Sequence, residues 1–384
     1  MKLFLVAFHM AHKKSWTILL FMIEMLLSSV VLMSLVGQML SLHKSAQITS
    51  AFNGDNCYYF SPRTYYDPDF SIEDYLSDDE KKNIQIGSVH IFSAKTKETQ
   101  SVRIIGYNNF IIERARMKMD SGTWFTDRKC DRIPLITVGN RYSVGQQIEF
   151  WDGTKGEVIG GIAKDSYIVS FQSSASSGKA SLQNLISVPT SIDFIAPFQS
   201  EKYMSLSDHI ISNELIEQSQ VIAVENVQEQ GQIVKSLKKY GDVSSIEQMI
   251  KNFEVENKNY FLINGIVFLV FTILTIVGIG GLNGIWSVEN DNVYTIMYML
   301  GLHTKTCMLV EAINTFTVVG VSYLAFFLLS HWLAKSILPK GVHYGNGIWI
   351  AILVYFLLIY ALTSVSSIVK AGKRNLMELY KREN

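Results

Sequence analysis

The chain has few groupings of residues whose types and spacing could do chemistry. Its densest acidic stretch is Asp67–Glu80 (DPDFSIEDYLSDDE), which lacks the alternating carboxylates and the central glycine of a calcium-binding EF-hand loop. His9 and His12 stand three residues apart, and no third ligand lies near them in the sequence. We therefore interpret the acidic stretch as a solvated loop and a short helix. We expect no metal and no cofactor in this chain.

Motifs of nucleophilic and nucleotide chemistry are missing from the sequence. It contains neither a His-Glu-x-x-His zinc motif nor a Gly-x-Ser-x-Gly elbow. A phosphate-binding loop needs Gly-x-x-x-x-Gly-Lys followed by Ser or Thr, and neither Gly178-Lys179-Ala180 nor Gly372-Lys373-Arg374 satisfies it. The chain is thus not expected to be an enzyme. Any nucleotide hydrolysis that drives it must come from another chain.

Two carboxylates lie inside long apolar runs, where an ionised group is costly. Glu24 lies deep in the first run, and Glu311 lies about one turn inside the third, from where it could reach the headgroup region. A charge at mid-membrane costs about 2.5–3.5 kcal/mol, so such residues usually face a partner or a wet cavity. A proton relay is one interpretation. Hydrogen bonding between helices is favoured, because no basic or histidine partner lies at matching depth.

Four long apolar runs, one at the start and three at the end, determine the expected architecture. They cover residues 15–40, 260–286, 307–333 and 347–369, and a bilayer crossing takes roughly 20 apolar residues. The sequence predicts a membrane α-helical protein with four transmembrane helices in a 1+3 arrangement. A large α+β extracytoplasmic domain, residues 41–259, is inserted between the first two. A cleaved signal peptide is disfavoured for the first run, which is long and has no Ala-x-Ala site after it.

Basic flanks predict the orientation of these helices. The amphipathic segment 1–14 and the tail 370–384 carry Lys and Arg, which stay in the cytoplasm. Both termini and the segment 287–306 are therefore expected inside, and residues 41–259 and the loop 334–346 outside. The formal net charge is zero, but the acidic excess lies in residues 41–259 and the basic excess in the remainder. Membrane lipid is an expected partner and nucleic acid is not.

The outer segment shows the patterns of mixed α and β structure. Ser101–Tyr107 and Ile133–Val138 are expected to be buried strands, because both are continuous apolar runs. Gln147–Trp151 and Glu157–Ile162 predict a hairpin around the turn Asp152-Gly153.

The last part of the outer segment predicts a strand and two helices. Val221–Val224 is the expected strand, and Val227–Tyr240 is a helix stopped by Gly241. A second helix begins near Ser245. The Ser-rich stretch 172–182 is interpreted as a loop or insertion.

Small residues supply two further expectations. Gly278, Gly280, Gly281 and Gly284 thin the second apolar run, and we expect a surface for close helix packing there. Cys57 and Cys130 lie in the outer segment and could form a disulfide, whereas Cys307 lies on the cytoplasmic side. Whether the first two cysteines pair is left open.

Several segments of the chain resemble MacB/FtsX-like ABC transporter permeases, with a MacB-type outer domain and an FtsX-type membrane domain. Gly106–Phe110 followed by Met119–Thr126 is similar to the family's outer-domain turn and its "l-x-x-G-r-x-f" pattern. The continuation of that pattern is matched by three segments: Ile133–Gly139, Val144–Ile148 and Val158–Ile162. The short helix that the family places between the first two of these segments is almost absent here.

A cytoplasmic segment carries the same resemblance. Tyr294–Gly301 is similar to the family's coupling helix, which fits into a cleft of the ATPase. The resemblance assigns ATPase coupling to seven residues: Tyr294, Ile296, Met297, Tyr298, Leu300, Gly301 and Leu302. Asn290–Val293 stands where the family carries charged residues, so we expect an apolar and aromatic contact. Glu311 falls where many members carry Glu, which favours a structural role.

The resemblance implies a permease subunit of an ABC transporter in the bacterial cytoplasmic membrane. It would work with a second permease, as a homodimer or a heterodimer, and with a separate cytoplasmic ATPase that binds ATP and Mg²⁺. The leading expectation is export or extraction of a peptide or an amphiphilic, antimicrobial-like compound. The alternative is a non-transporting mechanotransmission or envelope-sensing subunit that activates an extracytoplasmic partner. A free-standing receptor is the third interpretation.

Overall fold

The computed structural model of the 384-residue chain forms two compact units. The structure describes residues 15–54, 56–63, 72–98, 100–127, 131–171, 180–189, 191–206, 213–216, 219–226, 228–289, 291–301, 303–338 and 346–372. The first unit comprises the chain up to Met39 and from Asn259 onward, and the second comprises Leu40–Lys258.

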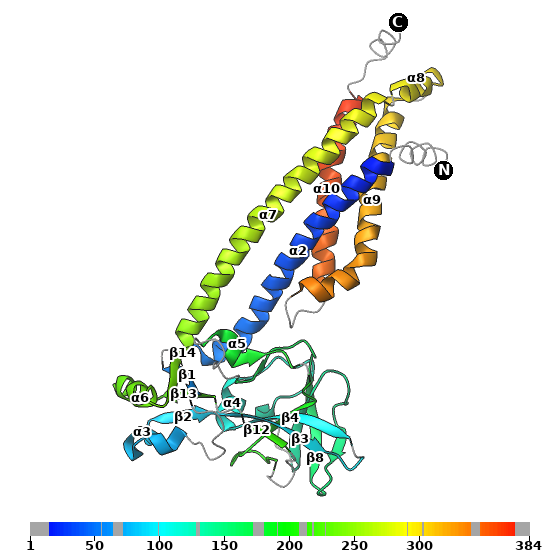
Figure 1. The fold of residues 1–384 in the computed structure, drawn as a ribbon. Coiled ribbons are helices and arrows are strands. Elements are labelled where there is room, and N and C mark those ends of the chain that lie inside the picture. The colour runs from blue at the N-terminus through cyan, green and yellow to red at the C-terminus, as the bar shows by residue number, and fades with distance from the viewer. Residues whose placement is uncertain are drawn as a thin grey trace. The chain divides into compact units, whose positions relative to one another are not determined.

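The first unit is built from long apolar helices (Figure 1). They are α2 (Ser15–Thr49), α7 (Ile246–Glu289), α9 (Thr304–Ile337) and α10 (Asn346–Gly372), and the short helix α8 (Asp291–Met299) lies between α7 and α9 in the chain. Within the described residues, four stretches are long and apolar enough to cross a membrane: Ile18–Phe52, Ile246–Trp286, Lys305–Ile337 and Gly347–Val365. These candidate spans fit the membrane protein that the sequence predicts.

Aromatic side chains pack α9 against α10. Three ring pairs mark the contact, with centroids 4.8, 5.2 and 5.7 Å apart: Phe327–Trp349, Tyr323–Phe356 and Phe316–Tyr360. In these pairs the residue number in α10 rises as the residue number in α9 falls, so the two helices run antiparallel.

Two contacts attach α7 to its neighbours in the first unit. The rings of Phe268 and Tyr355 of α10 lie 5.3 Å apart. The hydroxyl of Tyr260 lies 2.9 Å from the hydroxyl of Ser34 on α2. Aromatic packing and one hydrogen bond therefore hold α7 from two sides.

The smaller sheet of the second unit has four antiparallel strands. Its order is β14 (Gly241–Ser245), β1 (Cys57–Pro62), β13 (Gln220–Val224) and β2 (Ile84–Gly87). The 3₁₀ turn η2 (Ile72–Tyr75) and helix α6 (Gln230–Leu237) contribute to its core, and α3 (Asp78–Lys82) follows η2. The buried core residues are Phe60, Ile72, Leu76, Ile222, Val224, Ile233 and Leu237.

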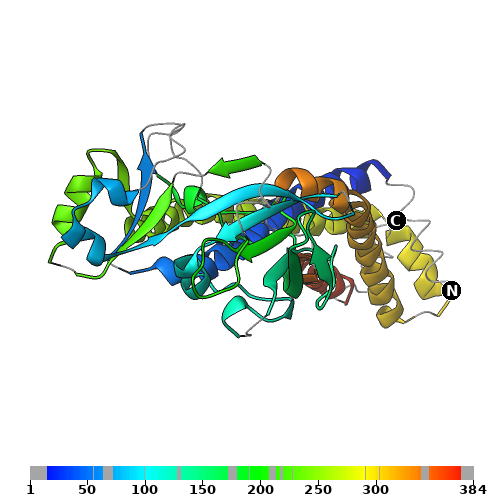
Figure 2. The same cartoon turned by 90° about the horizontal axis from the view of Figure 1, so that it is seen from below.

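The larger sheet has eight strands of mixed direction. Its order is β12 (Asn213–Ile216), β3 (Val89–Lys95), β4 (Ser101–Tyr107), β11 (Phe194–Pro197), β6 (Ile133–Val138), β8 (Lys155–Ile162) and β5 (Ser121–Gly122), and β7 (Gln147–Glu149) pairs with β8. β4 runs parallel to β11, and β6 runs parallel to β8. The long hairpin of β3 and β4 is drawn in cyan in Figure 2.

Both faces of the larger sheet are buried, which explains the continuous apolar run in β6. Ile133 and Leu135 lie in one apolar cluster, whereas Ile136 and Val138 lie in another. Successive side chains of a strand point to opposite faces, so a strand that is covered on both sides is apolar throughout.

Short elements complete the second unit. They are the strand pair β9 (Ile168–Val169) and β10 (Ile186–Ser187), helices α4 (Asn109–Arg114) and α5 (Leu182–Leu185), and the 3₁₀ turns η1 (Ser50–Phe52) and η3 (Phe125–Asp127).

The predicted strands agree with the structure and one predicted boundary does not. β4 and β6 have the predicted bounds, and β7 and β8 form the predicted hairpin, where Gly153 has a φ of 89°. The second helix begins near Ser245 as predicted, since α7 starts at Ile246. Gly241 does not end the first helix, because α6 ends at Leu237 and Gly241–Ser245 forms β14, which pairs with β1. Residues 172–179 of the Ser-rich stretch lie outside the described residues.

A fragment comprising residues 40–258 is expected to fold by itself. Both sheets and their apolar clusters lie within it, so its core is complete without the apolar helices. Thermal unfolding followed by circular dichroism should show one cooperative transition. A gradual loss of signal together with binding of a hydrophobic dye would contradict this expectation.

Candidate functional site

Helix α8 is short and ends at a glycine. The Leu300 N–H donates to the Ile296 carbonyl at 3.0 Å, which extends the last turn. Gly301 then has a φ of 80°, a left-handed conformation that favours glycine and ends helices. Helix α9 begins three residues later, at Thr304. Gly301, one of the predicted coupling residues, therefore sets the break between the two helices.

One side of α8 packs against the start of α9. Met297 is 7% exposed and clusters with Cys307 and Val310, and Val293 and Ile313 pack against this cluster. The Met297 side chain is therefore not available to a partner, contrary to the expected contact through this residue. It instead fixes α8 on α9.

A neighbouring face of α8 exposes apolar side chains. Ile296, Met299 and Leu300 are 57%, 66% and 75% exposed. Their spacing of i, i+3 and i+4 places them on one helix face, which we call the α8 apolar face. Met299 was not among the predicted residues, although this spacing identifies it. The side chains of Tyr294 and Tyr298, and all of Leu302, lie outside the described residues.

Glu24 lies against a glycine of α7. A Cβ atom at Gly278 would stand 2.7 Å from Phe21 Cε1 and 3.2 Å from Glu24 Oε2. Only glycine therefore lets these two side chains of α2 approach α7 so closely. A Cβ at Gly280 or Gly281 would meet nothing within 4 Å in the described part of the chain.

The predicted glycine packing surface is thus limited to Gly278 among the residues whose surroundings are described. Gly280 and Gly281 face open space, so the prediction that they pack against another helix is wrong for helices of this chain. Gly284 is half-buried.

Glu311 is buried inside the first unit. Its exposed fraction is 1%, and Asn314, one turn further along α9, is 2% exposed. This burial agrees with the structural role that the resemblance implies for Glu311, and its reach to the headgroup region stays a prediction. The surrounding side chains cover it, because Glu311 lies on the face of α9 that also carries Val310 and Val318.

Cys57 is a buried thiol without a disulfide partner among the described residues. Burial raises its pKa, and the nearby Arg114 guanidinium opposes that rise. The Arg114 Nη1 donates to Cys57 Sγ at 3.6 Å. A thiol of raised pKa is a poor nucleophile. Cys130 lies outside the described residues, so its pairing with Cys57 stays a prediction, and Cys307 is buried beside Met297.

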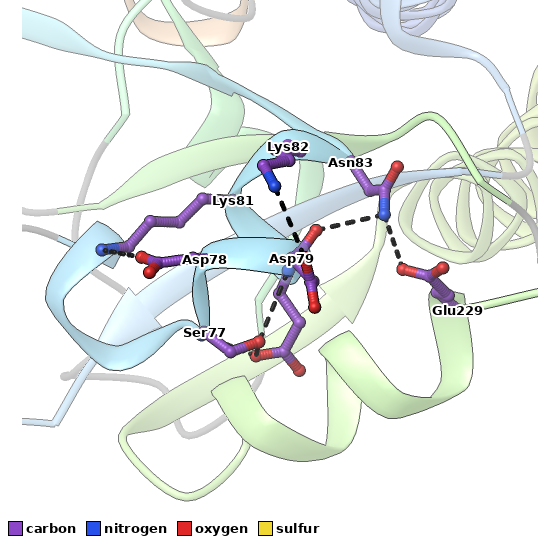
Figure 3. Close-up of polar contacts among 8 residues, drawn as sticks. Ser77, Asp78, Asp79, Lys81, Lys82, Asn83 and Glu229 are labelled. Carbon is purple, nitrogen blue, oxygen red and sulfur yellow. Dashed lines mark hydrogen bonds and ion pairs between the residues drawn. The ribbon is translucent and has the colours of Figure 1, made fainter.

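The described part of the acidic stretch forms a structural contact (Figure 3). The Ser77 N–H donates to Glu80 Oε2 at 2.9 Å, and the Ser236 hydroxyl of α6 donates to Glu80 Oε1 at 3.1 Å. The Asn83 side-chain amide donates to Glu229 Oε2 at 2.7 Å. No group of three His, Cys, Asp or Glu side chains that could hold a metal is found among the described residues. The carboxylates here tie α3 to α6.

Comparisons with known proteins give little. No protein-family model matches the chain, and no curated protein matches it. One similar solved structure is the extracellular domain of the noncanonic ABC-type transporter YknZ from Gram-positive bacteria. It is 13% identical, covers 52% of this chain and 94% of that chain, and has a TM-score of 0.24. A TM-score this low carries no argument, so function is inferred from the chain's own residues.

Replacing Gly278 with Leu should destabilise the helical unit. The new side chain overlaps Phe21 and Glu24, and overpacking of this kind costs about 1–3 kcal/mol. The matched control is Gly280→Leu, which adds the same side chain where a Cβ meets open space. The melting temperature of the full-length protein in detergent should fall for the first variant only. Equal losses would contradict the packing assigned to Gly278.

Replacing Glu80 with Gln should weaken the second unit in a pH-dependent way. The hydrogen bond from the Ser77 N–H lowers the pKa of Glu80. The ionised carboxylate therefore stabilises the fold above the ordinary carboxyl pKa, and this contribution is lost as the pH falls through the lowered value. Urea unfolding of residues 40–258 should show a loss of roughly 1 kcal/mol at neutral pH, which shrinks below about pH 4.

The control for Glu80→Gln is Asp79→Asn. Among the described residues, the Asp79 carboxylate pairs only with Lys82, at 3.5 Å and in solvent, so its replacement should change little. If both variants lose the same stability, or if the Glu80→Gln effect is independent of pH, the role assigned to the Glu80 carboxylate is contradicted.

Proposed function

We propose that this chain is the permease subunit of an ABC transporter. Its motion would be driven by a separate cytoplasmic ATPase that binds ATP and Mg²⁺. The proposal rests on the chain's own layout and on its sequence resemblance to MacB/FtsX-like permeases. One apolar helix precedes the α+β unit Leu40–Lys258 and three follow it. A second permease subunit, identical or not, and a bacterial cytoplasmic membrane belong to the same proposal.

The observation that carries the proposal is the two-sided packing of α8. Met297 fixes the helix to α9, while Ile296, Met299 and Leu300 remain exposed. Three adjacent large apolar side chains on one short helix are the kind of surface that a partner covers. Helix α8 lies between two candidate spans in the chain. The basic flanks of the sequence favour the cytoplasmic side for this helix.

The transported compound is proposed to be a peptide or an amphiphile handled by the α+β unit. Closure of the ATPase would move α8, and α8 is fixed to α9 through Met297, Cys307 and Val310. Force applied at α8 would thus enter the helical unit through a packed contact. Export or extraction then requires the outer unit to change its contacts with the compound as the helices move.

A second candidate function, transmission of motion without transport, is favoured by one observation. α2 runs unbroken from Ser15 to Thr49, and α7 from Ile246 to Glu289, so each helix belongs partly to both units. Continuous helices transmit displacement without a hinge. In this version the outer unit senses an envelope ligand or activates an extracytoplasmic partner. This second function would be favoured if no tested compound is transported while the ATPase is bound and active.

Replacing Leu300 with Asp should release the ATPase. An unpaired carboxylate buried in the contact costs about 3 kcal/mol or more, which is about a hundredfold in affinity. The control Leu300→Met keeps an apolar side chain at the same position and should retain binding. Copurification of the ATPase is measured, together with the resistance of the cells to the transported compound. The variants are compared at equal amounts in the membrane. Retained binding in Leu300→Asp, or absence of any ABC ATPase in the wild-type preparation, contradicts the proposal.

A further inference from the structure

Glu24 is a carboxyl group deep in a candidate span, and no other side chain of the described residues compensates it. It follows Trp16 on α2 and lies about 12 Å further along the helix axis, within a hydrocarbon core of about 30 Å. Glu24 has no hydrogen bond and no ion pair among the described residues. The stretches 16–42, 260–302, 306–330 and 344–369 contain no Lys, Arg or His. The spans therefore offer no opposite charge at this depth.

Helices α2 and α7 run antiparallel on either side of Glu24. The hydroxyls of Ser34 and Tyr260 meet at one level, and Phe21 and Glu24 meet Gly278 at another. Between these levels the residue number in α7 rises as the residue number in α2 falls. The turn before Glu24 therefore lies beside the turn after Gly278, and the turn after Glu24 lies beside the turn before Gly278.

Open apolar positions flank the carboxyl group on both helices, one turn to each side. They stand at i−4 and i+3 from Glu24 on α2 and at i−4 and i+3 from Gly278 on α7, so each pair shares a helix face with the residue between its members. The side chains of three of them are exposed, and a Cβ at the fourth, a glycine, would meet nothing within 4 Å. The four positions are Leu20 and Leu27 of α2, and Leu274 and Gly281 of α7.

We call these four positions, with Glu24 and Gly278 between them, the α2–α7 seam. Glu24 itself is half-buried, so part of its side chain is accessible from outside the helix pair. The seam is thus an open apolar surface with one carboxyl group at its middle.

The chemistry of the seam selects its occupant. An ionised carboxylate in an apolar region is costly unless an opposite charge pairs with it. Metal cations take several oxygen ligands, and the described side chains of the seam supply only the oxygens of one carboxyl group. A second copy of the chain would bring another carboxylate and no basic side chain at this depth. A lipophilic organic cation supplies both a single positive charge and an apolar body.

We propose that the α2–α7 seam binds one lipophilic monovalent cation per chain, of the organic ammonium or phosphonium class. The Glu24 carboxylate pairs with the positive charge, and the three leucines contact the apolar groups. Gly281 leaves room for the ligand beside the carboxylate. The inference rests on the proposed function in one respect, since it names the class of amphiphile that the permease would accept from the bilayer. Binding itself requires no ATPase.

Equilibrium dialysis of the full-length protein in detergent against tetraphenylphosphonium measures this binding. The wild type should bind the phosphonium ion saturably. Glu24→Gln keeps the shape of the side chain and removes its charge, so the affinity should fall about tenfold or more. Tetraphenylborate has the same shape and the opposite charge. In separate dialysis it should show no difference between the wild type and Glu24→Gln.

Gly281→Leu and Gly280→Leu form a matched pair that tests the place of the site. Gly281 lies about 60° around α7 from Gly278, whereas Gly280 lies about 160° away. A leucine at position 281 fills the seam and should remove most of the phosphonium binding, and a leucine at position 280 should leave it unchanged. Both positions face open space, so both variants should keep the melting temperature of the wild type.

Three results overturn the site. The first is a wild type without saturable phosphonium binding, which leaves a second copy of the chain or lipid as the cover of the seam. The second is an unchanged affinity in Glu24→Gln, as expected of a carboxyl group that is simply protonated. The third is an equal loss of binding in the two leucine variants.

The proposed permease role is tested separately by copurification of the ATPase. Any of the three results with the ATPase still bound contradicts the cation site alone. If no ABC ATPase copurifies while Glu24→Gln loses phosphonium binding, the permease role is contradicted and the cation site is supported.

Discussion

A segment that crosses lipid must satisfy all of its own backbone hydrogen bonds, and this constraint governs the division of the chain. The four candidate spans are single helices, whose N–H and C=O groups pair internally. Both sheets lie within Leu40–Lys258, where strands such as β1 and β13 from distant parts of the sequence pair with each other. A chain under this constraint uses helices where it meets lipid and can use sheets only elsewhere.

The sequence predicted the elements that depend on local pattern. Ser101–Tyr107 and Ile133–Val138 have the predicted bounds, because burial on both faces makes each a continuous apolar run. The Asp152-Gly153 turn specified its hairpin locally, through the positive φ of Gly153 and the hydrogen bonds that the Asp152 carboxylate accepts from Thr154. Gly241–Ser245 was missed, because a polar segment becomes a strand only through pairing with the distant β1. Such pairing leaves little trace in local composition.

The sequence predicted where the candidate site lies in the chain, but not which side chains of α8 are buried and which are exposed. A nine-residue helix shows which residues share a side, but not which side the rest of the chain covers, so Met297 and Ile296 could not be distinguished beforehand. The same reason separates Gly278, which meets Phe21, from Gly280, which meets open space.

The most direct measurement of the central claim, that the α8 apolar face contacts an ATPase, is photo-crosslinking in intact cells. A photoreactive amino acid is placed at Leu300, which is exposed, and in a second variant at Thr295, which is buried on the same helix. Adducts are identified by mass spectrometry at equal membrane levels of the two variants. The account predicts a covalent adduct between Leu300 and a cytoplasmic ABC ATPase, and none from Thr295. Absence of an ATPase adduct from Leu300, or equal adducts from both positions, would contradict it.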